Sequence, residues 1–213
     1  MTVCVIGAGP AGLFAAIEAA NRGAEVFILE KNSLPGRKLL LTGSGQCNLT
    51  HHGCPDELLA HMGPAQSFLK PSFYSWSPAD SMAFFSQRGV PSSADEHGKV
   101  FPLSRRAADV LEALMKQCRA SRVKLITGAA AVRIDQGFSI TCRDRRRFRS
   151  DRIILAPGGA SYPATGSSGD GFALAKALGH TIEPPRPALC AVQTAPHDFS
   201  ELSGLSVRQA YIT

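Results

Sequence analysis

The chain has 213 residues, of which 44% are hydrophobic and 19% are charged, and its net charge is +6. An apolar fraction of this size excludes disorder over most of the length. A transmembrane helix is not expected, because no apolar run approaches the roughly 18 residues that a span needs. The apolar run Val3–Ile6 is too short for a secretion signal. The length suits one medium-sized domain, or one domain and the start of another.

The six cysteines form no C-x-x-C pair and are too sparse for a disulfide scaffold. Without a secretion signal, they indicate reduced thiols in a cytoplasmic protein. The segment Cys47–Cys54 carries cysteines and histidines, but a structural zinc site needs a second ligand pair, which the sequence lacks. We therefore expect no metal site.

The first thirty residues have the order of a dinucleotide-binding unit. The β-branched run Thr2–Ile6 predicts a buried strand, and the glycine loop Gly7–Gly12 follows it at once. Apolar residues at helical spacing predict a helix over Leu13–Arg22. A second apolar strand, Glu25–Leu29, leads to Glu30. This order is typical of a Rossmann-like α/β domain.

Each residue type in this unit has a physical reason. Gly7 permits a tight turn, Gly9 lets a pyrophosphate approach the backbone, and Gly12 lets the helix pack close to the sheet. The helix N-terminus offers free N–H groups to phosphates. Glu30, 21 residues after Gly9, can accept both ribose hydroxyls of an adenosine, which disfavours NADP at this site. The candidate residues of this ADP site are Gly7, Gly9, Pro10, Ala11, Gly12, Glu30 and Lys31.

A second glycine-rich segment covers residues 36–50. Arg37 and Lys38 place two cations in it, and Thr42–Gly45 holds too much glycine for a helix interior. A flexible surface loop is one interpretation. The close succession of polar residues in Cys47–Thr50 favours another, in which the segment lines a site for a flat polar ligand.

This segment resembles a known family, the BaiN/RdsA (YhiN-like) group of NAD(P)/FAD-dependent oxidoreductases, also called aminoacetone-oxidase-like flavoproteins. The family pattern G-R-K-x-x-x-[ST]-G-x-G-x-C-N-x-[ST] matches the chain from Gly36 to Thr50. Two further matching segments are Gly98–Ser104 and Tyr162–Gly171. The resemblance runs from residue 2 to about residue 213.

The resemblance implies a Rossmann-like FAD-binding domain, with a parallel sheet and a β-meander, over residues 1–187. It implies the first strands of an inserted β-rich domain over residues 188–213, and we find no counterpart of the family's C-terminal return segment. Residues 36–50 would wrap the pyrophosphate and the isoalloxazine, and Pro157 stands where related flavoproteins carry threonine. The additional cofactor-binding residues are Gly36, Arg37, Lys38, Thr42, Gly43, Ser44, Gly45, Cys47, Asn48, Ala131, Ala156, Gly158 and Gly159.

The remaining elements follow from periodicity and turn residues. Residues 55–88 predict short helices interrupted by Pro64, Pro71 and Pro78, and residues 89–102 look extended. Ser104 is the expected N-cap of a helix over Arg105–Ala120. Short strands are expected at 123–126, 129–134, 137–142, 146–148 and 152–156, followed by a helix over 170–178 and strands at 188–194 and 205–213.

Six arginines and two aspartates between Arg143 and Arg152 give this segment a local net charge of +4. The solvated edge of a hairpin is one interpretation, and a footprint for a polyanion such as RNA is the other.

The resemblance predicts an FAD-dependent oxidoreductase that passes hydride to an unsaturated substrate, with NAD(P)H as a candidate electron donor. One alternative is a flavin-dependent reductase that converts uridine to dihydrouridine in ribosomal RNA. Another is an inactive, truncated dinucleotide-binding fragment. No catalytic residue set stands out, so the catalytic residues, the substrate (a small molecule or RNA) and the oligomeric state stay open.

Overall fold

The computed structural model describes residues 1–186, and Met1–Ile182 form one compact unit. The strands expected at 188–194 and 205–213, and with them the inserted domain, lie outside the described residues. Within residues 1–186, no helix is both long and apolar enough to cross a membrane.

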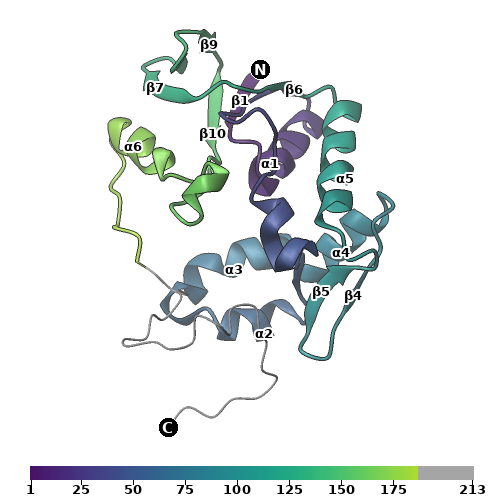
Figure 1. Ribbon diagram of the computed structural model, residues 1–213. Helices are drawn as coiled ribbons and strands as arrows, with labels where there is room; N and C mark the ends of the chain where they lie inside the picture. The colour runs from purple at the N-terminus through teal and green to yellow at the C-terminus, as the bar shows by residue number, and fades with distance from the viewer. Residues whose placement is uncertain (187–213) are drawn as a thin grey trace, which may run out of the picture. The chain divides into compact units, whose positions relative to one another are not determined.

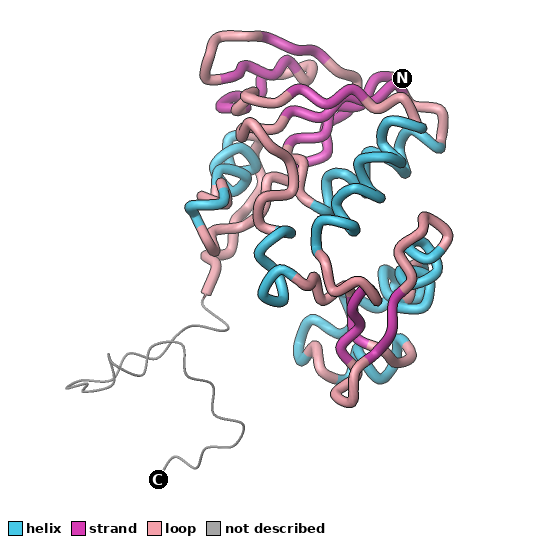
Figure 2. The backbone as a smooth tube through the Cα atoms, turned by 45° about the vertical axis from the view of Figure 1, so that its right-hand side comes forward, coloured by secondary structure: helices cyan, strands magenta, loops and turns pink. Residues whose placement is uncertain are grey.

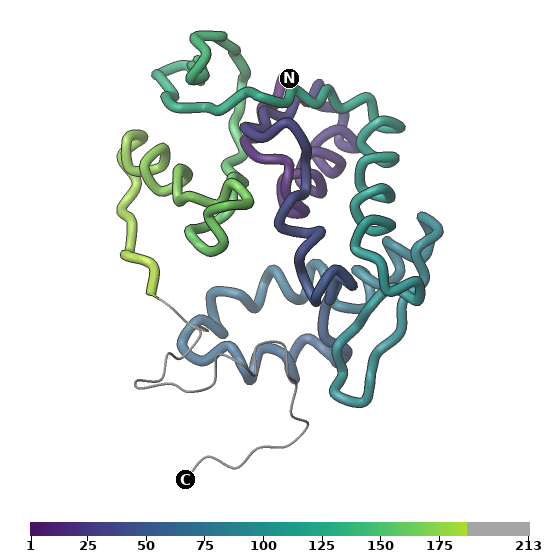
Figure 3. Tube along the Cα trace, in the orientation of Figure 1, coloured from purple at the N-terminus to yellow at the C-terminus, as the bar shows by residue number. Residues whose placement is uncertain are grey.

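A four-stranded parallel sheet forms the centre of the unit, in the order β10-β1-β2-β6. These strands are β10 (Arg152–Leu155), β1 (Thr2–Ile6), β2 (Glu25–Leu29) and β6 (Lys124–Ile126). Figure 3 shows the purple N-terminal strand beside the green segment that returns near residue 155. The chain adds strands on one side of β1 and then returns to the other side, so a topological switch point lies between β1 and β10.

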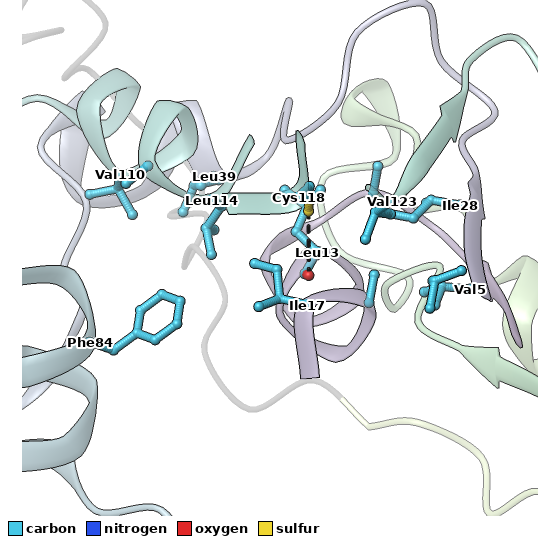
Figure 4. Close-up of a cluster of buried hydrophobic side chains, with 14 of the residues drawn as sticks. Val5, Leu13, Ile17, Ile28, Leu39, Phe84, Val110, Leu114, Cys118 and Val123 are labelled. Carbon is cyan, nitrogen blue, oxygen red and sulfur yellow. Dashed lines mark hydrogen bonds between the residues drawn. The ribbon is translucent and has the colours of Figure 1, made fainter. Parts of the chain in front are cut away.

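One face of the sheet is covered by two helices, α1 (Pro10–Asn21) and α5 (Ala107–Ala120). Alternate residues of β1, such as Val5, point to this face and pack with Ile17 and Leu114. Figure 4 shows this core, in which the Cys118 thiol donates to the carbonyl oxygen of Leu13 at 3.7 Å. Val110, Ala113 and Leu114 lie on the core face of α5.

The other face of the sheet is covered by an antiparallel meander. Its strands are β7 (Ala131–Asp135), β8 (Ser139–Cys142) and β9 (Arg147–Arg149), paired in that order. Ile134, Ile140 and the ring of Phe148 pack against this face of the sheet. Helix α6 (Asp170–Ala177) adds Leu174 to the same cluster. These layers confirm the predicted α/β fold with a parallel sheet and a meander (Figure 1).

Residues 39–102 form helices and a small antiparallel sheet, β3-β5-β4, which Figure 2 shows apart from the central sheet. The elements are η1 (Leu39–Gly45), β3 (Thr50–His51), α2 (Pro55–Ala60), η2 (Gly63–Ala65), α3 (Gln66–Ser75), α4 (Pro78–Ser86), β4 (Ser92–Ala94) and β5 (Lys99–Pro102). A short 3-10 turn, η3 (Pro163–Thr165), precedes α6.

Three predictions about helices were wrong in detail. The first helix begins at Pro10 rather than Leu13, because proline is well tolerated as the first helical residue. Ser104 does not cap α5, because Arg105 has a left-handed backbone (φ 52°) and the helix begins after Arg106. Pro71 lies inside α3 rather than ending a helix.

Candidate functional site

A cavity of about 470 Å³ lies where the carboxyl ends of β1, β2 and β10 meet. This is the edge of a parallel sheet, beside its switch point, where ligands bind in doubly wound folds. The lining comes from four segments that are distant in the sequence. They lie within residues 6–11 (the end of β1, the β1–α1 loop and the start of α1), 29–39, 129–131 and 155–174.

The three glycines of the β1–α1 loop have different surroundings. A Cβ on Gly7, whose φ is +103°, would lie 2.7 Å from the Cα of Pro157, and a Cβ on Gly12 would overlap the carbonyl oxygen of Gly7. A Cβ on Gly9 would meet nothing within 4 Å, although this residue lines the cavity. Gly7 and Gly12 are therefore needed for chain packing, while Gly9 leaves open space beside the helix N-terminus, whose first N–H groups have no intrahelical partner.

Glu30 is buried at the end of β2 and lines the cavity. Its Oε2 accepts the backbone N–H of Ala8 at 2.7 Å, and its Oε1 accepts the backbone and side-chain N–H groups of Asn32 at 2.8 Å each. A carboxylate has about four acceptor positions, so one remains on Oε2. One ribose hydroxyl fits without rearrangement, whereas a second would have to replace an Asn32 donor. Recognition of both hydroxyls stays a prediction.

Two cations of the second glycine segment line the cavity, and neither has a carboxylate partner among the described residues. Arg37 donates to Oδ1 of Asn32 at 3.2 Å, and Lys38 donates to Oγ of Ser161 at 3.3 Å. Neither forms an ion pair within residues 1–186. Both line the cavity, which gives it two uncompensated positive charges suited to a pyrophosphate.

Lys31 lines the cavity but is bound to protein groups. Its Nζ lies 2.6 Å from Oδ2 of Asp170 and 2.7 Å from Oγ of Ser168. The hydrogen bond from Lys31 holds the pKa of the Asp170 carboxyl below its usual range. Its ammonium thus joins the segment after β2 to the segment before α6, and contact of Lys31 with the cofactor stays a prediction.

The structure brings most of the predicted residues together. Those that line the cavity are Gly7, Gly9, Pro10, Ala11, Glu30, Lys31, Gly36, Arg37, Lys38, Ala131, Ala156 and Gly158. Those outside the lining are Gly12, Thr42, Gly43, Ser44, Gly45, Cys47, Asn48 and Gly159.

Residues 42–48 pack against β5 rather than into the cavity. A Cβ on Gly43 would lie 3.2 Å from the ring of Phe101. With its amide nitrogen turned toward these oxygens, Asn48 donates to the carbonyl oxygens of Val100 and Thr50. The Cys47 thiol is buried in the core, and burial raises its pKa. Contact of these residues with an isoalloxazine stays a prediction.

Sequence reasoning left several lining residues unassigned, chiefly Asn32, Thr165, Ser167 and Asp170. The signal for the last three was present, because the glycine-rich segment Tyr162–Gly171 runs into the start of a helix. The local sequence does not show that this segment returns beside the end of β2. The contacts of Lys31 with Asp170 and of Asn32 with Thr165 join residues more than 130 positions apart.

Within the described residues, the five cysteines are unpaired, and no group of three or more His, Cys, Asp or Glu side chains is arranged to hold a metal ion. The cavity lining contains no cysteine or histidine. Its chemistry is that of backbone N–H groups, the Glu30 carboxylate and two cations, Arg37 and Lys38, that form no ion pair within residues 1–186, which suits an anionic nucleotide.

Comparison with known sequences gives one family and several curated relatives. The profile of the HI0933-like protein Rossmann domain matches residues 1–211. The chain is 36% identical over 206 residues to a 3-dehydro-bile acid delta(4,6)-reductase of Clostridium scindens, covering 94% of this chain and 49% of that protein. It is 26% identical over 214 residues to a ribosomal RNA dihydrouridine synthase of Haemophilus influenzae, covering 95% and 52%. The chain thus spans about half the length of these relatives.

Among solved structures, a 3-ketosteroid-delta4-(5alpha)-dehydrogenase from Rhodococcus jostii RHA1 matches with a TM-score of 0.58 and 19% identity, over 75% of this chain and 46% of that one. THI4 from Thermovibrio ammonificans matches with a TM-score of 0.50 and 16% identity, over 77% and 60%. At these identities the likeness concerns the fold.

Proposed function

Because this chain belongs to the HI0933-like Rossmann-domain family, we propose that its cavity binds the ADP half of FAD and that the protein acts as a flavin-dependent oxidoreductase. One observation carries the proposal. The cavity at the strand ends combines open space at Gly9, an acceptor on Glu30 and two unpaired cations, Arg37 and Lys38. These are the groups that a ribose and a pyrophosphate need.

The residues of this chain would hold the dinucleotide in three ways. The N–H groups at the start of α1 bind the phosphates, and Arg37 and Lys38 neutralise their charge. Glu30 accepts a ribose hydroxyl, and the backbone of Ala131 borders the adenine. FAD, when bound, supplies hydride transfer. Residues 42–48 remain our proposed contact for the isoalloxazine.

The substrate and electron donor are proposed from the relatives. A bile acid delta(4,6)-reductase and a dihydrouridine synthase carry names that describe the addition of hydrogen across a carbon–carbon double bond. We propose an unsaturated carbonyl compound as the substrate and NAD(P)H as the donor. The unpaired cysteines of the described residues support a cytoplasmic location.

The test is a visible absorption spectrum of the purified chain after incubation with FAD and removal of excess cofactor. We expect the bands of oxidised flavin at one FAD per chain, and their bleaching by NADH or NADPH without oxygen. A colourless protein that also fails to bind ADP would contradict the proposal. If the protein is yellow but neither NADH nor NADPH bleaches it, the result supports FAD binding and contradicts NAD(P)H as the donor.

A second candidate is reduction of uridine in RNA, and the outer face of the meander favours it. Strand pairing places Arg133, Thr141 and Arg147 in one row across the three strands, and Arg149 in the next. These arginines are exposed. Within residues 1–186, Arg147 and Arg149 form no ion pair, so their charge is available to phosphates.

This candidate is tested by binding of a single-stranded RNA at several salt concentrations. Each phosphate contact contributes about 0.7 to the slope of log K against log salt concentration. Replacing both Arg147 and Arg149 with alanine should therefore reduce the magnitude of that slope by about 1.4. The control replaces Arg119, in the last turn of α5, and Arg122, just after that helix, and so changes the net charge equally. Equal effects of both double variants would contradict an RNA site on the meander.

A further inference from the structure

The cavity has two walls that are built from distant parts of the chain. One wall is the segment after β2, residues 30–38, and the other is the segment between β10 and α6, residues 156–170. The walls touch at three places. Lys31 binds Ser168 and Asp170, the Asn32 amide donates to the carbonyl oxygen of Thr165, and Lys38 donates to Ser161.

The contact at Lys31 is the strongest of the three. Its hydrogen bonds measure 2.6 and 2.7 Å, against 3.3 Å for each of the other two contacts. Ser168 also donates to Oδ1 of Asp170 at 2.9 Å, so the three side chains form a closed ring. The Lys31 and Asp170 side chains are only 23% and 38% exposed, whereas those of the surface pair Lys124–Glu25 are 70% and 65% exposed. Partial burial leaves the Lys31–Asp170 pair less screened by solvent.

The backbone around this ring is shaped to bring the walls together. Gly166 has a φ of +99°, and a Cβ on it would lie 2.6 Å from the Asn32 amide nitrogen and 3.2 Å from Cε of Lys31. A side chain there would push the walls apart. The close approach of the two walls therefore depends on glycine at position 166. The contact between Pro157 and Gly171 at the start of α6 depends on a glycine in the same way.

We propose that the Lys31–Asp170 ion pair is a clasp that holds the two cavity walls together around a bound adenine dinucleotide and slows its release. Both are positioning residues that act through the walls. Without Lys31, the Asp170 carboxylate would also line the cavity as an unpaired negative charge and repel the pyrophosphate. The inference rests on the proposed function, since it requires that the cavity bind FAD or ADP.

The clasp differs measurably from a direct contact between Lys31 and the ligand. If Lys31 bound the phosphates, its loss would weaken binding equally with or without the Asp170 carboxylate. If Lys31 acts through Asp170, the two substitutions are coupled, and Asp170→Asn removes the need for Lys31. A double-mutant cycle therefore separates the two roles.

The experiment measures FAD release from the purified chain by stopped-flow fluorescence after mixing with excess ADP. We expect Lys31→Met to speed release by about tenfold and Asp170→Asn by about threefold, in the range of contacting residues. The double variant should match Asp170→Asn, and Lys31→Arg should stay within about twofold of the wild type. Lys124→Met, which breaks an exposed ion pair between a lysine and a carboxylate, is the matched control and should leave the release rate unchanged. Melting temperatures without ligand that lie well above the assay temperature show that faster release in a variant is not caused by unfolding.

Each outcome decides the inference. The clasp would be overturned if the double variant released FAD at a rate that multiplies the two single effects. It would also be overturned if Asp170→Asn released FAD as slowly as the wild type. Either result would leave FAD binding itself intact. If Lys31→Met does not fold, Asp170→Asn must still speed release and Lys31→Arg must not. A wild-type chain that binds neither FAD nor ADP would overturn the proposed function and the clasp together.

Discussion

Gly9 differs from the other glycines of the β1–α1 loop because a side chain there meets only the cavity. We predict that Gly9→Thr abolishes ADP binding and leaves the fold intact, since threonine caps a helix about as well as glycine does. Its β-branched side chain occupies the space that a pyrophosphate needs. Isothermal titration calorimetry with ADP and a thermal melt check both parts.

Gly12→Ala is the matched comparison, because its new Cβ would overlap the backbone of Gly7. We expect this variant to lose stability as well as binding. A Gly9→Thr variant that binds ADP as tightly as the wild type would show that the phosphates do not pass this loop.

The buried thiols make stability depend on pH. Burial, with a smaller effect of Cys142, raises the pKa of Cys4 to about 12 from an ordinary value of 9.0. Between these values the unfolded thiol loses its proton and the folded thiol keeps it, so the native state binds more protons and stability falls as pH rises. Below pH 9 this contribution is fully present.

We therefore predict that the free energy of unfolding declines above pH 9, and that Cys4→Ala makes the decline shallower by up to about 1.4 kcal/mol per pH unit. Denaturant titrations at pH 8, 9 and 10 measure it. Val5→Ala, which removes a buried side chain from the same strand but no thiol, is the control and should leave the slope unchanged. A slope that is the same in Cys4→Ala and the wild type would mean that Cys4 ionises equally in both states.

At the scale of elements, the packing of α1 on α5 holds the glycine loop in place. Leu114 on α5 is 1% exposed and belongs to the same cluster as Leu13 and Ile17 of α1. We predict that Leu114→Ala destabilises the protein by about 2–5 kcal/mol, the usual cost of a large-to-alanine change in a core. Leu103→Ala, at a residue 60% exposed, should cost less than about 0.5 kcal/mol. Urea denaturation compares the two, and similar losses would contradict this account of the core.

The elements whose patterns are local could be predicted from the sequence. The β1–α1–β2 unit, the meander strands and the existence of α5 follow from periodicity and glycine positions. The start of α5 could not, because Arg105 takes a left-handed backbone while its guanidinium stacks on Phe101 and donates to Gln46. That conformation is favoured by tertiary contacts, which outweigh the capping preference of Ser104.

At the scale of the whole molecule, the cavity is made by the return of the chain from β6 through the meander to β10. The residues themselves indicated the glycine loop Gly7–Gly12 and the wall after β2, because Glu30 and Arg37 have recognisable ribose and phosphate chemistry. In the second wall only Ala156, Gly158 and Gly159 were expected at the site. The second wall depends on which strand neighbours β1, and Thr165 and Asp170 reach the site only because β10 pairs there. For the same reason, Lys31 could not be recognised from sequence as the partner of Asp170.

The central claim is that this cavity recognises the ADP half of FAD, and competition measures it most directly. FAD bound to the purified chain is followed by its fluorescence while ADP or FMN is added. We predict that ADP displaces FAD and that FMN, which lacks the adenosine, does not. Displacement by FMN with no effect of ADP would place recognition at the flavin end and contradict the assignment of the glycine loop, Glu30 and the two cations to the dinucleotide.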